Sequence, residues 1–133
     1  MIARILITIA TLVYGIAPLL ADLNATHVFH PEWTPHARLH LVWMLGSNFC
    51  IAALAIWLLW FRAQPVLAAV LGLCVTGGFW IAIATRSLYG GALSDFGSDV
   101  GKSLFMEGNA LVFGAIVILL IAGIALEKIR AAA

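Results

Sequence analysis

Charged residues are scarce in this sequence. Only 10% of its 133 residues are Asp, Glu, Lys or Arg, whereas a soluble domain has about 25%. Hydrophobic residues make up 64%, so the few charges cannot cover a water-exposed globule, and most of the surface must face lipid. The net charge of +1 provides neither a basic face for nucleic acid nor an acidic tail.

Several catalytic and nucleotide-binding motifs are also missing. The sequence has no G-x-S-x-G elbow, P-loop, Rossmann fingerprint or C-x-x-C-H, which argues against hydrolase, nucleotide-binding and c-type haem functions. The two cysteines, Cys50 and Cys74, lie in apolar runs without C-x-x-C spacing, and we expect small buried hydrophobic side chains there.

Four long apolar runs dominate what is present, and a bilayer core needs about 20 such residues per helix. They predict an all-α integral membrane four-transmembrane-helix bundle, a single domain over 1–133 with helices at about 2–20, 35–61, 65–86 and 103–127. The runs are continuous, whereas barrel strands alternate. Arg4 and the small residues near Ala21 also fit a signal peptide, but the length of the first run favours a retained helix.

Loop charges give a weak prediction of orientation. With four spans, both termini share a side, which would carry Arg4, Arg62, Lys128 and Arg130. The other side would carry Arg38, Arg86 and Lys102. The positive-inside rule then favours cytoplasmic termini, as in a bacterial inner-membrane protein, and places the histidine loop and the Asp95–Lys102 loop together on the opposite side.

All four histidines fall within fourteen residues, between His27 and His40. Histidine is the side chain that most readily ligates a metal or moves a proton near neutral pH. Thr34-Pro35 predicts a helix start, so His36 and His40 should share a helix face that continues through Met44 to Asn48. An asparagine at that depth is costly unless it faces protein or a ligand, although an interfacial histidine pair and a structural asparagine fit equally well.

Two more features could carry chemistry. His27 and His30 share a loop with carboxylates and could bind zinc or iron, or the loop could be a lid with Trp33 at the membrane interface. Glu107 begins an apolar helix, so it is a candidate proton donor, or else a structural partner of Arg38 or Arg86.

The bundle also carries packing signals. Small residues recur four apart, at Ala68, Gly72 and Thr76 and at Ala110 and Gly114, which favours close helix packing in a compact bundle or an oligomer. Trp43 and Trp80 could wall a pocket for an apolar ligand.

The segment Trp33-Thr34-Pro35-His36-Ala37-Arg38-Leu39-His40 resembles the styrene oxide isomerase family, small four-helix membrane enzymes with an Ala-Arg-x-His motif at the start of the second helix. The resemblance implies that His40 ligates a haem b at the subunit interfaces of a trimer and that Arg38 is the motif arginine. It also implies that ferric iron acts as a Lewis acid on an epoxide oxygen, which gives a carbonyl compound by a 1,2-shift.

The sequence departs from that family at its substrate-holding residues. The family asparagine falls at Gly46, two residues before Asn48, and the position nearest the family tyrosine is Arg86, with Tyr89 further on. The other three histidines have no counterpart there. The four-helix layout is also similar to the emopamil-binding sterol isomerases and to DoxX-like membrane proteins.

Three hypotheses follow. The favoured one is an isomerase of a small lipophilic substrate, with haem b on His40, Asn48 or Tyr89 orienting the substrate oxygen, and Arg38 and His36 nearby. The second is a cofactor-free acid–base enzyme on a lipid or terpenoid that uses His36 or His40 with Glu107. The third is a non-enzymatic helical subunit of a membrane complex. A homo-oligomer, such as a trimer, is expected, and nucleic acid is not.

Overall fold

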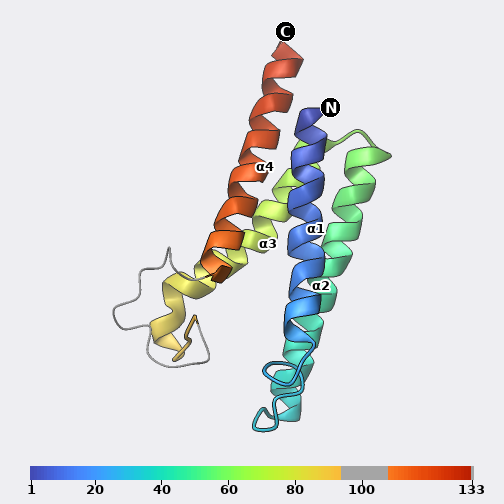
Figure 1. Cartoon of the computed structure of the whole chain (residues 1–133). Helices are drawn as coiled ribbons and strands as arrows, with labels where there is room; N and C mark the ends of the chain where they lie inside the picture. The colour runs from blue at the N-terminus through green and yellow to red at the C-terminus, as the bar shows by residue number, and fades with distance from the viewer. Residues whose placement is uncertain (94–107, 133) are drawn as a thin grey trace.

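Long helices form most of the computed structural model, which describes residues 1–93 and 108–132. The described chain contains α1 (Ile2–Asp22), α2 (Pro35–Trp60), α3 (Pro65–Thr85), the short 3-10 helix η1 (Arg86–Leu88) and α4 (Gly108–Ala132) (Figure 1). The four long helices are each long and apolar enough to cross a membrane. The predicted all-α bundle with four membrane-spanning helices is therefore confirmed.

The helix ends follow the predicted capping chemistry. Thr34 Oγ1 accepts a hydrogen bond from the Ala37 amide at 3.2 Å, and Pro35 occupies the first helical position. Between α2 and α3 the chain reverses through Ala63, which has a φ of 51°, before Pro65 starts the next helix. The last helix extends beyond the predicted position 127 to Ala132, because helix-forming residues follow the end of the apolar run.

The helix order places the two chain ends together. The N-terminus, the C-terminus and the α2–α3 turn lie at one end of the molecule, and the α1–α2 loop lies at the other (Figure 1). We call these the terminal end and the loop end. The two termini thus lie at the same end of the bundle, and the side of the membrane that they face stays a prediction.

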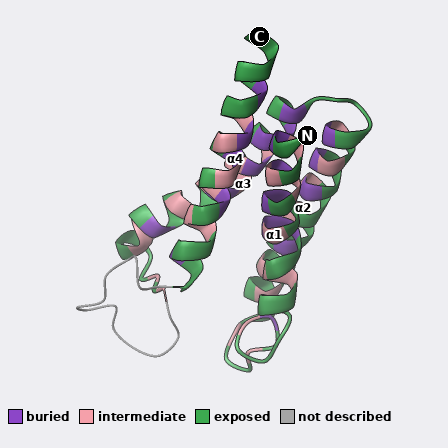
Figure 2. Ribbon diagram, turned by 45° about the horizontal axis from the view of Figure 1, so that its top comes forward, coloured by how far each residue is buried: buried purple, intermediate pink, exposed green. Residues whose placement is uncertain are grey.

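The helices pack most closely toward the terminal end, through small residues. A Cβ on Gly72 would lie 2.9 Å from both Tyr14 Cε1 and Leu120 Cδ1, so this glycine allows α1, α3 and α4 to meet. Ala68 and Thr76 on the same face are fully buried. At the loop end the α1–α2 pair and the α3–α4 pair diverge, and fewer residues are buried (Figure 2).

The outer faces are apolar, as lipid contact requires. Large hydrophobic side chains such as Leu39, Ile81 and Ile118 are more than half exposed. Cys50 and Cys74 are also exposed, so the prediction that they are buried is wrong. Cys74 lines the cavity described below and Cys50 does not, and apolar composition alone does not identify which side of a helix is packed.

Candidate functional site

A cavity of about 780 Å³ lies where the four helices diverge. Each helix contributes one face to its walls, with residues spaced three or four apart. The apolar walls include Val13, Pro18, Met44, Ile51, Val75, Phe79, Phe113 and Ile116. The small side chains Ala17, Gly78 and Ala82 leave the space open. The cavity is therefore mostly apolar and is part of the helix packing itself.

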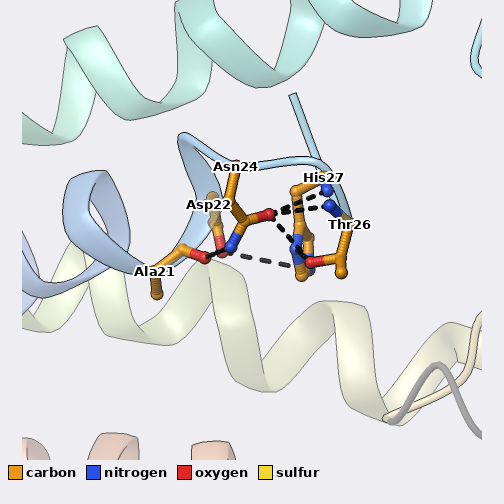
Figure 3. A network of polar contacts seen from close by, with 5 residues as sticks. All are labelled: Ala21, Asp22, Asn24, Thr26 and His27. Carbon is orange, nitrogen blue, oxygen red and sulfur yellow. Dashed lines mark hydrogen bonds and ion pairs between the residues drawn. The ribbon is translucent and has the colours of Figure 1, made fainter. Parts of the chain in front are cut away.

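A carboxylate and an imidazole line this cavity together. Asp22 is the last residue of α1, and His27 belongs to the loop that follows. His27 Nε2 lies 3.9 Å from Asp22 Oδ1 (Figure 3). The loop turns back on the helix end because the Val28 amide donates a 3.0 Å hydrogen bond to the Asp22 carbonyl.

Asn24 organises this turn. Its Nδ2 donates to the Ala21 carbonyl at 2.6 Å, which fixes the direction of the side-chain amide. Its Oδ1 then accepts from the backbone amides of Thr26 and His27 at 2.9 and 3.1 Å and from the Thr26 hydroxyl at 2.8 Å (Figure 3). An Asx turn of this kind is a common use of asparagine.

The same bonds determine the tautomer of His27. The Thr26 hydroxyl has one hydrogen and donates it to Asn24. Thr26 Oγ1, which is 2.8 Å from His27 Nδ1, must therefore accept from that nitrogen. In a neutral ring the hydrogen then resides on Nδ1, and Nε2 keeps its lone pair on the side of Asp22. The arrangement leaves Nε2 as the basic atom.

Asn48 adds an amide to the wall of α2. It lines the cavity, is half-buried and makes no hydrogen bond to any described residue. Asn109, in the first turn of α4, also lines the cavity. Deeper in, Tyr14 forms part of the wall, while its hydroxyl and the Thr11 hydroxyl are buried without a partner in the described part of the chain. An unpaired amide inside a membrane span costs free energy unless a bound molecule or water satisfies it.

Only half of the predicted His36–His40–Met44–Asn48 face borders the cavity. Met44 and Asn48 line the cavity, whereas His36 and His40 are exposed and do not line it. The His36 and His40 Nε2 atoms lie 3.0 Å apart, and the His40 ring stacks on Trp43 with centroids 5.9 Å apart. Each four-residue step advances about 40° around a helix, so three steps turn His36 about 120° from Asn48.

Arg38 and Tyr89 do not line the cavity, and their side chains donate hydrogen bonds to backbone carbonyls. Arg38 Nη2 donates to the carbonyls of His30 and Pro31 at 2.7 and 3.3 Å, which fastens the loop to α2. The Tyr89 hydroxyl donates to the Ala82 carbonyl at 2.7 Å. The predicted pocket walls Trp43 and Trp80 are likewise absent from the cavity lining.

His27 and His30 have different hydrogen-bond and charge partners, although both rings lie beside Trp33. His30 Nδ1 accepts from the Glu32 amide at 3.3 Å, while His27 faces Asp22. Over residues 1–93 and 108–132, no group of three or more His, Cys, Asp or Glu side chains could hold a metal ion. Glu107, predicted as a proton donor, lies outside the described residues, as does the Asp95–Lys102 loop.

The pair formed by Asp22 and His27 is the feature that the sequence interpretation missed. The available signal was Asn24 two residues before Thr26, which is typical of an Asx turn that reverses the chain. Such a turn brings a residue that ends a helix close to one five positions later. The four-residue spacing of His36 and His40 instead predicted a site on the second helix.

Comparison with known proteins places the whole bundle in one family. No curated protein and no solved structure matches the chain. A family described as a family of unknown function, DUF6640, matches residues 6–133, which include most of α1, all of α2, α3 and α4, and the residues that line the cavity. The chain thus belongs to the DUF6640 family.

Proposed function

We propose that this protein is a membrane-embedded enzyme that moves a proton on a small lipophilic molecule held in the four-helix cavity. One observation carries the proposal: the Asp22–His27 pair lines an otherwise apolar cavity of about 780 Å³. Small-molecule sites span about 300–1,000 Å³ and combine apolar walls with a few polar groups. The helices around the cavity make a lipid-soluble molecule its natural occupant.

The chemistry is an allylic isomerisation, in which a carbon–carbon double bond conjugated to a carbonyl group changes position. His27 Nε2 takes a proton from an activated carbon of the substrate, and the electron pair of the broken C–H bond shifts into the conjugated system. The resulting imidazolium is stabilised by Asp22 and by the Nδ1–H bond to Thr26. While it is on Nε2, this proton exchanges with water. Nε2 then gives a proton to a second carbon, so the product is an isomer and the enzyme is regenerated.

Asn48 supplies the complementary electrostatics. Its amide has no described protein partner, so its N–H groups are free to donate to a substrate carbonyl or hydroxyl oxygen. Such a donor stabilises the negative charge that develops on the substrate oxygen while the proton is bound to His27 Nε2. The substrate class is therefore a lipophilic molecule with one oxygen function.

Occupancy of the cavity can be tested with two adjacent glycines of α3. Gly78 lines the cavity and Gly77 does not, and a Cβ on either would meet nothing within 4 Å. Gly78→Leu should fill the cavity and abolish binding of the isoprenoid alcohol farnesol, measured by native mass spectrometry of detergent-solubilised protein. Gly77→Leu is the matched control and should bind like the wild type. Equal binding by all three proteins would contradict the proposed site.

Proton transfer can be tested without knowing the substrate. Membranes that contain the protein are incubated in deuterated water, and the extracted lipids are examined for carbon-bound deuterium. We expect label with the wild type and with His30→Gln, and its loss with His27→Gln and Asp22→Asn. The same labelling with His27→Gln as with the wild type would rule out the role of His27. No enzyme-dependent label, together with a co-purifying protein, would favour a non-enzymatic subunit.

A haem b ligated by His40 is a second proposal, drawn from the Ala37-Arg38-Leu39-His40 motif. Within one chain the residues do not form a haem pocket, because His40 does not line the cavity and its Nε2 faces His36 at 3.0 Å. His40, Leu39 and Trp43 are all exposed, so a second copy would have to complete the site. A Soret band that disappears in His40→Ala would support the haem proposal. Purified protein that is active but has no Soret band would contradict it.

A further inference from the structure

Two imidazoles at the loop end have no part in the cavity chemistry. His36 and His40 lie in the first two turns of α2, both exposed, with their Nε2 atoms 3.0 Å apart. The rings are perpendicular, with centroids 4.5 Å apart. Between two neutral rings at this distance, one Nε2–H donates to the lone pair of the other. The helix therefore holds two metal-binding atoms side by side.

We propose that His36 and His40 form a two-nitrogen site for a divalent transition-metal ion of the Cu²⁺ or Ni²⁺ type. A metal–imidazole bond is about 2.0–2.1 Å, so two bonds at a right angle hold the nitrogens about 3 Å apart, and tetrahedral bonds hold them about 3.4 Å apart. The 3.0 Å between the two hydrogen-bonded nitrogens is closer to the separation at a right angle. Square-planar nitrogen and oxygen coordination is the preference of Cu²⁺ and Ni²⁺.

The local structure preorganises the two imidazole rings. Four-residue spacing sets the rings on one helix face, and the N-terminal cap by Thr34 fixes the turn that carries them. The Trp43 ring stacks on His40 at an interplanar angle of 27°, which restricts that side chain. On metal binding, the donating ring moves its hydrogen to Nδ1 and rotates, so that both Nε2 lone pairs face the ion. Since the described residues offer no third protein ligand, water fills the remaining positions.

Copper binding to the full chain tests the site. The protein is purified without a histidine tag, and Cu²⁺ is added to it in detergent. We expect one tight site per chain, an electron paramagnetic resonance spectrum with two equivalent nitrogen ligands, and quenching of Trp43 emission. His36→Ala and His40→Ala should each lose the tight site and the two-nitrogen pattern. His30→Ala, which removes a histidine of the neighbouring loop, should keep both.

Specific results would overturn the proposal. Unchanged copper binding in His36→Ala would place the ion elsewhere, and loss of binding in His30→Ala would mean that the loop histidines hold it. Trp43→Phe should keep the copper spectrum and lose the quenching, which ties the signal to this face. His36→Ala removes an exposed side chain, and circular dichroism verifies its helix content. Because these readouts need no substrate, they are independent of the proposed proton transfer at His27. A Soret band that disappears in His40→Ala would assign His40 to haem and would overturn the copper site.

Discussion

Asn24 controls the chemistry of His27 without lining the cavity. Its side-chain oxygen accepts three hydrogen bonds, and the one from the Thr26 hydroxyl obliges His27 Nδ1 to be the donor to Thr26. The proton acceptor of the proposed reaction is thereby assigned to Nε2. A residue outside the cavity thus selects which His27 nitrogen keeps the lone pair on the side of Asp22, which is the kind of support that residues around a proposed catalytic group provide.

Replacement of Asn24 tests this control. Asn24→Ala removes the acceptor for the Thr26 and His27 amides, and each net hydrogen bond is worth about 0.5–1.5 kcal/mol. We expect faster amide hydrogen exchange at both residues and a lower unfolding temperature in detergent. Asn24→Asp keeps an acceptor oxygen and should protect both amides. Unchanged exchange in Asn24→Ala would contradict the network.

Arg38 illustrates how a motif residue can have a structural role. The resemblance to styrene oxide isomerases suggests chemistry for it, while its guanidinium binds two carbonyls of the α1–α2 loop. Hydrogen bonds from a charged donor contribute about 1.5–3 kcal/mol, so this contact is well suited to hold the loop against α2. The loop in turn carries His27, which makes Arg38 a positioning residue in the proposed enzyme.

At the scale of the helix, the small-residue face of α3 decides how closely its neighbours approach. Gly72 faces both α1 and α4, whereas Gly77 has open space where a side chain would be. Substitutions of the two glycines therefore separate the effect of helix packing on stability from the effect of helix propensity. In a membrane, such close approach replaces the hydrophobic driving force that helices have in water.

Alanine at these two positions should have opposite effects. Gly72→Ala places a Cβ at 2.9 Å from Tyr14 and Leu120 atoms, so the helices must separate and the unfolding temperature should fall. Gly77→Ala meets nothing within 4 Å and gains about 1 kcal/mol of helix propensity, so it should be neutral or stabilising. Thermal unfolding in one detergent compares them. A Gly72→Ala protein as stable as Gly77→Ala would contradict the packing described.

At the scale of the whole molecule, the shared location of the termini makes the orientation testable. The terminal end holds the start of α1, the α2–α3 turn and the end of α4 (Figure 1), and these segments carry Arg4, Arg62, Lys128 and Arg130. Arg38 is in the first turn of α2 and Arg86 begins η1, at the opposite ends of α2 and α3. The positive-inside rule then predicts a cytoplasmic terminal end, with the Asp22–His27 pair on the opposite side.

Labelling of single cysteines measures this orientation. In a chain with Cys50 and Cys74 replaced by alanine, Ala25→Cys should react with a membrane-impermeant maleimide in intact cells. Gln64→Cys and Ala132→Cys should react only after lysis. The reverse pattern would invert the orientation. Labelling of Gln64→Cys and Ala132→Cys from different sides would contradict four membrane spans.

The candidate site was only partly predictable from the sequence. Asn48 was identified because an amide in an apolar helix is conspicuous, and the structure places it on the cavity wall. His36 and His40 were expected beside it, but a row of residues spaced by four winds around the helix, and its ends face different directions. The partnership of His27 with Asp22 depends on a turn whose geometry comes from several weak side-chain bonds.

By itself, the sequence determined that the chain forms four apolar helices, because lipid admits only backbone groups that are already hydrogen-bonded. It also determined the helix starts, through Thr34 and Pro35. Only the tertiary structure decided where the helices diverge, and therefore which polar side chains share a cavity. That depends on contacts between distant small residues, such as Gly72 against Tyr14 and Leu120, and hydropathy does not encode them.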